Sequence, residues 1–288
     1  MVMCLKILIL SIFLSFISSV KSQTKIGLWE PRYTGVCKKS IFFDNDSLSN
    51  VPIIGDEKHG TAVSDVLLKN LSNFELYHAG FIPLTEYLGK IGALSMTPKE
   101  RKKHLEYEIN IFNHFVQYSI RWFKEQNVRV INMSFGTSAN IFAENNQNLG
   151  YTDSERIRNA KWWMEKFKMA FDSAFRSAPD ILFVVAAGND GEDLEQAVDI
   201  PALINLPNVL CVGALAKDGK RIISNYGKRI DVFVPAENIQ WHDKDGLTHY
   251  DTGTSLAVPQ VVNKAVRLLQ WNPNLSPSEL KNILRCLN

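Results

Sequence analysis

Residues 181–189 read ILFVVAAGN, an apolar run that ends in Gly188-Asn189. Five similar runs lie along the chain, rich in Val, Ile and Leu and without a clean alternation of polar and apolar residues. This pattern is typical of strands that are covered on both faces, as in a parallel sheet. The six predicted strands are residues 25–30, 74–79, 128–134, 181–187, 208–213 and 230–234.

Helical patterns separate these strands. Thr97-Pro98-Lys99-Glu100 and Ser276-Pro277-Ser278-Glu279 each read as a capping box with proline at the first helical position. Strand and helix alternate, which predicts a three-layer α/β/α fold with a mainly parallel sheet. The predicted helices are residues 61–71, 97–126 and 153–178, one after Ser255 and one that starts at Ser276.

The first 22 residues differ in character from the rest. Lys6 precedes the apolar stretch 7–17, and Val20-Lys21-Ser22 ends it, which is typical of a secretory signal peptide. An uncleaved anchor is the alternative. We therefore expect a secreted chain with one domain, residues 23–288, and no membrane contact once the signal is removed. Only a residue or so separates the cut site from the first strand, so no pro-segment is evident.

Composition excludes several function classes. The 288 residues are 22% charged and 45% hydrophobic, as in ordinary globular proteins, and the formal net charge of +2 gives no basic excess for nucleic acid. We expect a monomer without a nucleic-acid partner. Cys211 lies in an apolar run and is predicted to be buried, whereas the sequence leaves open whether Cys37 and Cys286 are bonded.

Binding and catalytic residues are expected directly after the strands, because ligands of such sheets bind outside the carboxyl ends of the strands. His59, Asn189 and Ser255 all lie at such ends or at helix starts. Taken singly, they read as a hydrogen-bonded core histidine, a turn asparagine and an N-cap serine. Together they supply the base, the oxyanion donor and the nucleophile that acyl transfer needs.

Four motifs carry a resemblance to a known family. They are His59-Gly60-Thr61, Asn132-Met133-Ser134-Phe135-Gly136, Ala186-Ala187-Gly188-Asn189 and Gly253-Thr254-Ser255-Leu256-Ala257-Val258-Pro259. In their residue types and in their order along the chain, these motifs resemble those of subtilisin-like serine proteases, the subtilases of peptidase family S8. The similarity runs from about residue 24 to residue 288.

The resemblance implies a subtilisin-like fold and a secreted serine endopeptidase that acts on peptides or proteins. Ser255 would be the nucleophile and His59 the general base, with Asn189 in the oxyanion hole. The substrate pocket would be lined by Ser134, Phe135, Gly136, Ala186, Ala187 and Gly188. No cofactor is evident, and no metal site is predicted. Structural calcium is implied by the resemblance alone.

The third member of the triad departs from the family. The family has an aspartate at the end of the first strand, whereas this chain has Glu30, followed by Pro31-Arg32. Glutamate is longer by about 1.5 Å, and we expect its carboxylate to orient His59 in place of the aspartate. Asp44, Asp46 and Asp56 are alternative acids.

Two further expectations follow. By alignment with the family, Asp199 falls at the base of the specificity pocket, where a carboxylate would favour Lys or Arg in the substrate; a solvated loop carboxylate is the alternative. The substitution of Glu30 also leaves open a different function, that of a catalytically impaired pseudopeptidase that binds peptide or protein partners.

Overall fold

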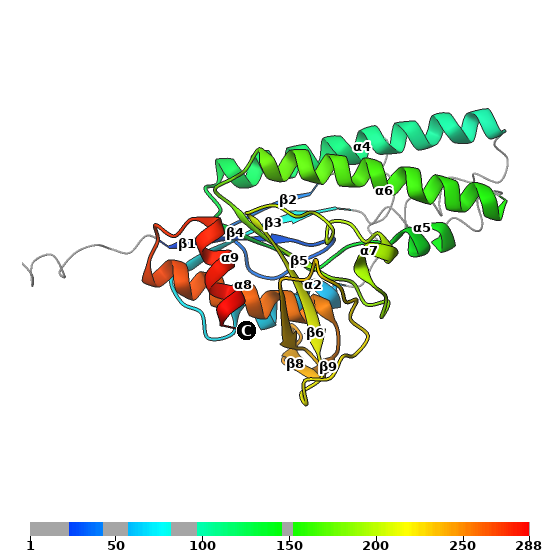
Figure 1. Ribbon diagram of the computed structural model, residues 1–288. Helices are drawn as coiled ribbons and strands as arrows, with labels where there is room; N and C mark the ends of the chain where they lie inside the picture. Colours follow the sequence, from blue (N-terminus) through cyan, green and yellow to red (C-terminus); the bar gives the residue numbers. More distant parts are fainter. Residues whose placement is uncertain (1–22, 43–56, 82–96, 146–151, 288) are drawn as a thin grey trace, which may run out of the picture.

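A seven-stranded parallel sheet forms the centre of the protein (Figure 1). The computed structural model describes residues 23–42, 57–81, 97–145 and 152–287. Every pairing in the sheet is parallel, in the order β2-β3-β1-β4-β5-β6-β7. The strands are β1 Thr24–Trp29, β2 Lys39–Phe42, β3 Phe74–Gly80, β4 Val130–Met133, β5 Leu182–Ala186, β6 Val209–Leu215 and β7 Val232–Pro235.

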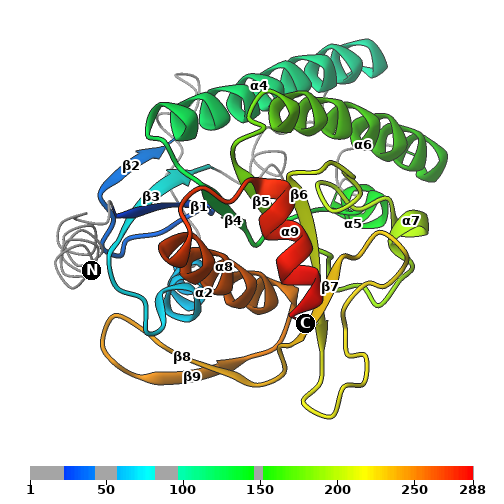
Figure 2. The same ribbon diagram turned by 60° about the vertical axis from the view of Figure 1, so that its left-hand side comes forward.

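Helices cover both faces of the sheet (Figures 1 and 2). The long helices α4 and α6 lie side by side on one face, and α2, α8 and α9 lie on the other. The predicted three-layer α/β/α fold is thus confirmed. The helices are α2 Lys58–Leu68, α4 Pro98–Glu125, α5 Ala139–Asn145, α6 Asp153–Arg176, α7 Leu194–Ala197, α8 Thr254–Trp271 and α9 Pro277–Cys286.

Side chains of each strand alternate between two apolar cores. In β1, Ile26 and Leu28 face the α2 and α8 side, whereas Trp29 faces α4 and α6. In β5, Val184 faces the first core and Phe183 the second. Both faces are therefore apolar, which explains why the strands lack a polar alternation. Each fully buried aliphatic or aromatic side chain contributes about 1.5–3 kcal/mol to folding.

The sequence pattern located six of the seven strands of the sheet and missed the edge strand β2 and two short helices. The edge strand β2 has only four residues, half of them exposed, so it carries little apolar signal. The short helices α5 and α7 also went unpredicted. The capping boxes at Thr97 and Ser276 are confirmed, and Thr152 forms a third one at the start of α6.

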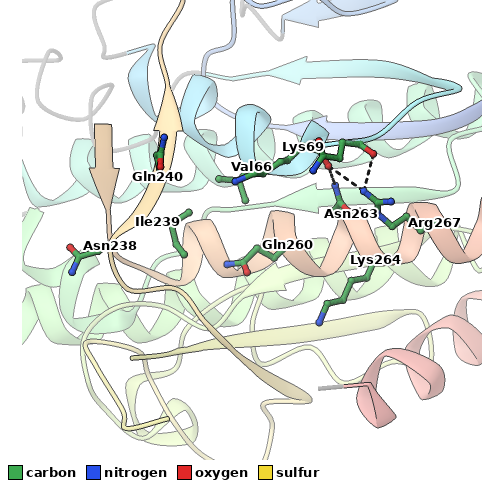
Figure 3. A pocket seen from close by; sticks show the side chains of 10 residues that line it. Val66, Lys69, Asn238, Ile239, Gln240, Gln260, Asn263, Lys264 and Arg267 are labelled. Atoms are coloured by element: carbon green, nitrogen blue, oxygen red, sulfur yellow. Dashed lines mark hydrogen bonds between the residues drawn. The ribbon is translucent and has the colours of Figure 1, made fainter. Parts of the chain in front are cut away.

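Helices α2 and α8 are joined by side-chain hydrogen bonds at the C-terminal end of α2 (Figure 3). Asn263 Nδ2 of α8 donates to the carbonyls of Leu67 (2.8 Å) and Lys69 (3.0 Å), and Arg267 donates to Asn70 O (2.8 Å). These bonds satisfy carbonyls that a helix end leaves without partners. A pocket of about 380 Å³ lies beside these hydrogen bonds.

A two-stranded hairpin lies outside the seven-stranded sheet. Strands β8 Ile239–His242 and β9 Thr248–Asp251 form an antiparallel hairpin next to α2.

Cys211 is fully buried, as predicted, and Cys37, Cys211 and Cys286 are free thiols in the described part of the chain. Within the described ranges, no helix has both the length and the apolar character that crossing a membrane would require.

Candidate active site

Glu30 and His59 meet at the carboxyl end of β1. Leu28 faces the α2 side of the sheet, and Glu30, two residues on, faces the same side because strand side chains alternate. His59 lies in the first turn of α2. Its Nδ1 is 2.9 Å from Glu30 Oε2, and the Glu30 side chain is fully buried while the His59 side chain is 48% exposed. The longer acid therefore reaches the histidine.

Both backbone groups of Glu30 are held by hydrogen bonds. Its N–H donates to Ala79 O at 3.2 Å, and its carbonyl accepts from His78 Nε2 at 3.1 Å. Burial lowers the pKa of His78, which favours the neutral ring. Since Nε2 is the donor, Nδ1 accepts from the Ser40 hydroxyl at 2.8 Å. These bonds fix the point from which the Glu30 side chain extends.

Ser255 lies in the first turn of α8, where it exchanges two side-chain-to-backbone hydrogen bonds with Ser134 in the loop after β4. Ser255 Oγ donates to Ser134 O at 3.1 Å, and Ser134 Oγ donates to Ser255 O at 2.8 Å. Ser134 Oγ in turn accepts from Asn132 Nδ2 at 2.9 Å. The reciprocal pair fixes the nucleophile predicted from sequence to the end of β4.

Asn189 is oriented by the residue that precedes Ser255. Its Oδ1 accepts from the backbone N and from Oγ1 of Thr254, both at 2.9 Å. The amide nitrogen Nδ2 is therefore at the opposite end of the group, away from Thr254. Gly253, the N-cap of α8 next to this amide, has a φ of +153°, a backbone conformation that residues with a side chain rarely adopt.

The two segments predicted to line the pocket lie side by side. Ser134–Gly136 follows β4 and Ala186–Gly188 ends β5, the neighbouring strand. The ring of Phe135 contacts Trp29, with ring centroids 5.7 Å apart, so this residue also belongs to the aromatic core. Asp199 is 2% exposed, so the solvated alternative is wrong.

The sequence analysis missed several supporting residues. Thr254 and Asn132 belong to motifs that it quoted, and their polar side chains beside Ser255 and Ser134 were a usable signal. The contact of His78 with Glu30 had no such signal, because it depends on strand register. The alternative acids Asp44, Asp46 and Asp56 lie outside the described residues.

Comparison with known proteins connects this geometry to a family. The model of the Subtilase family matches residues 43–285. A subtilisin-like protease of Coccidioides posadasii is 38% identical over 141 residues, 45% of this chain and 33% of the relative. Alkaline protease 1 of Aspergillus clavatus is 41% identical over 108 residues, 36% of this chain and 26% of the relative. The chain thus matches about a third or less of these curated relatives.

A solved structure supports the same assignment of fold. The crystal structure of a cold adapted subtilisin-like serine proteinase superposes with a TM-score of 0.57 and 21% identity, covering 92% of this chain and 82% of that chain. At this identity the likeness concerns the fold. The family model, however, matches most of the chain. The chain therefore belongs to the subtilase family.

Proposed function

We propose that this protein is a serine endopeptidase that cleaves peptide bonds through an acyl-enzyme on Ser255. The observation that carries the proposal is the 2.9 Å contact between His59 Nδ1 and the fully buried carboxylate of Glu30. This contact supports Glu30 as the acid that orients His59. Membership of the subtilase family and the oriented amide of Asn189 support the same function.

In the first half of the reaction, Glu30 accepts the Nδ1–H of His59, which leaves Nε2 as the basic nitrogen. The Ser255 hydroxyl turns from the Ser134 carbonyl to His59, gives its proton to Nε2 and attacks the substrate carbonyl carbon. The carbonyl oxygen becomes an oxyanion, which Asn189 Nδ2 and the Ser255 backbone N–H stabilise.

The second half reverses these transfers. His59 Nε2–H protonates the leaving amine as the C–N bond breaks, which leaves an ester on Ser255. A water molecule then gives a proton to His59 Nε2, and the water oxygen attacks the carbonyl carbon of the ester. The acid product leaves as Ser255 recovers its proton. Glu30 stays ionised throughout and stabilises the imidazolium that forms twice in each cycle.

A secreted location is part of the proposal. It rests on the signal-like pattern of residues 1–22, which lie outside the described residues, and on one relative, a Thermus proteinase named as extracellular. The implied calcium has no assigned ligands. Within the described ranges, no three His, Cys, Asp or Glu side chains converge as a metal site would require.

The test is intact-mass analysis after treatment with a fluorophosphonate, which reacts only with an activated serine. We expect one adduct on the wild type and none on Ser255→Ala. Ser278→Ala, which removes an exposed hydroxyl at the start of α9, is the matched control and should be labelled like the wild type. A folded wild-type protein without an adduct would instead support the pseudopeptidase alternative.

A further inference from the structure

The pocket of about 380 Å³ lies where the end of α2, the strand β8 and the helix α8 meet (Figure 3). Val66 of α2 and Lys69, the residue that ends this helix, line one side of it. Ile239 of β8 lines a second side, and α8 contributes Lys264 and Arg267. None of the described lining residues belongs to the proposed catalytic site, so a ligand here would bind apart from the substrate.

The charged residues that line the pocket are all cationic. They are Lys69, Lys264 and Arg267, and no Asp or Glu is among the described lining residues. Five further lining residues carry side-chain amides, each with an NH₂ group that can donate hydrogen bonds. Three neighbouring positive charges repel one another, and an anion placed between them would offset that repulsion. The lining therefore favours an anionic ligand.

The guanidinium of Arg267 is oriented in advance by hydrogen bonds. Its Nε donates to Asn263 Oδ1 at 2.9 Å, and its Nη2 donates to Asn70 O at 2.8 Å. Carbonyls at the end of α2 would repel an anion, but those of Leu67, Lys69 and Asn70 already accept hydrogen bonds from Asn263 or Arg267. Within the described ranges, Nη1 of Arg267 forms no hydrogen bond. A fixed guanidinium loses little conformational entropy when it binds an oxyanion.

The two lysines add charge to the same pocket. Lys69 is exposed, and its ammonium forms no hydrogen bond or ion pair with the other described residues. Lys264 is partly buried, and this burial lowers the pKa of its amine because desolvation disfavours the charged form. An anion bound beside Lys264 would favour the charged form again.

We propose that this pocket binds a tetrahedral oxyanion, the phosphate or sulfate group of a small ligand. The guanidinium of Arg267 and the ammonium of Lys69 donate charge-assisted hydrogen bonds to the oxyanion. Small-molecule sites typically enclose about 300–1,000 Å³, so the volume of about 380 Å³ leaves room for a small organic group on the oxyanion. Val66 and Ile239 offer that group an apolar surface. The inference does not depend on the chemistry of Ser255.

The experiment is titration calorimetry of the intact protein at a constant ionic strength of about 0.1 M, which screens charges beyond about 10 Å. Phenyl phosphate, inorganic phosphate and phenol are titrated separately. We expect phenyl phosphate to bind with a Kd on the order of 1 mM, and phenol not to bind. Tighter binding of phenyl phosphate than of inorganic phosphate would identify an ester as the ligand class, and equal binding would identify the oxyanion alone. A wild type that binds neither anion, or that binds phenol as tightly as phenyl phosphate, overturns the inference.

Variants then locate the binding. Lys69→Gln and Arg267→Gln should each weaken the binding of phenyl phosphate by about fivefold to tenfold, because each removes one charged donor. Arg267→Gln also removes hydrogen bonds to the end of α2, whereas Lys69→Gln removes none, so Lys69→Gln tests the site without a change in folding. Lys168→Gln is the matched control, since it neutralises an exposed lysine of α6 on the other face of the sheet and should bind like the wild type. Unchanged affinity in Lys69→Gln, or an equal loss in Lys168→Gln, would show that the anion binds elsewhere and overturn the inference.

Discussion

Replacing Glu30 by aspartate, the residue usual in subtilases, should impair this protein. The Glu30 carboxylate reaches His59 Nδ1 at 2.9 Å from a backbone that is bonded at both N–H and C=O. β1 is also paired on both sides, with β3 and β4, so the strand end is held in place. Removing one methylene would retract the carboxylate by about 1.5 Å, to about 4.4 Å from Nδ1, beyond hydrogen-bond distance.

The magnitude follows from Coulomb's law applied to the imidazolium that forms in the transition state. With an effective dielectric constant of about 20, a carboxylate at 2.9 Å attracts the ring by about 5.7 kcal/mol, and one at about 4.4 Å by about 3.8 kcal/mol. The difference of about 2 kcal/mol corresponds to about 30-fold in rate. Solvent at the half-exposed ring screens part of this difference, so we expect a loss of about 10- to 30-fold.

The assay is the second-order rate of fluorophosphonate labelling, which does not require a known substrate. Glu30→Asp should label about 10- to 30-fold more slowly than the wild type, and Glu30→Gln about 10⁴-fold more slowly, because an amide cannot stabilise the imidazolium. Glu57→Asp shortens a nearby exposed glutamate, bonded to Thr34, by the same methylene and should have little effect. Labelling of Glu30→Asp as fast as the wild type would refute the distance argument.

Three further predictions concern other parts of the site and its support. Asn189→Ala should lower kcat by about 10²–10³ with KM nearly unchanged, and an effect confined to KM would contradict its place in the oxyanion hole. Asp199→Asn should raise the Tm at neutral pH. The folded state of the wild type raises the pKa of Asp199, so the stability gained by holding its proton is complete below the unfolded-state pKa of about 4 and is lost as pH rises. The variant's advantage, about 2–4 °C per kcal/mol, should therefore vanish in acid, and a pH-independent difference would contradict the burial argument. Asn263→Ala should cost about 1 kcal/mol of folding free energy in denaturant unfolding, because it removes the hydrogen bond to Leu67 O and one of the two side-chain bonds to Lys69 O, and an unchanged midpoint would show that these bonds do not stabilise the fold.

The sheet was predictable because its signal is local. Strands that are covered on both faces must be apolar at every position, as β5 is, and this property can be recognised without knowledge of partners. The edge strand β2 was not predicted, because two of its four residues are exposed and it therefore lacks a continuous apolar run. Likewise, Ser255, His59 and Asn189 were found from residue types and motif order, which are visible in the chain itself.

The contacts at the site were not predictable in this way. Whether Glu30 reaches His59 depends on how closely the end of β1 approaches α2, and that distance results from the packing of the whole α2 and α8 layer. The reciprocal bonds of Ser134 and Ser255 join residues 121 positions apart. Such distances depend on many packed side chains at once, and no local pattern encodes them.

The sequence by itself thus determined the fold class and named three candidates for the chemical groups that acyl transfer requires. Only the tertiary structure decided that the Glu30 carboxylate lies 2.9 Å from His59 Nδ1 and that Asp199 is buried beside two glycines. The reason is physical. Burial patterns and helix caps arise from neighbouring residues, whereas ångström-scale distances between side chains arise from packing across the entire core.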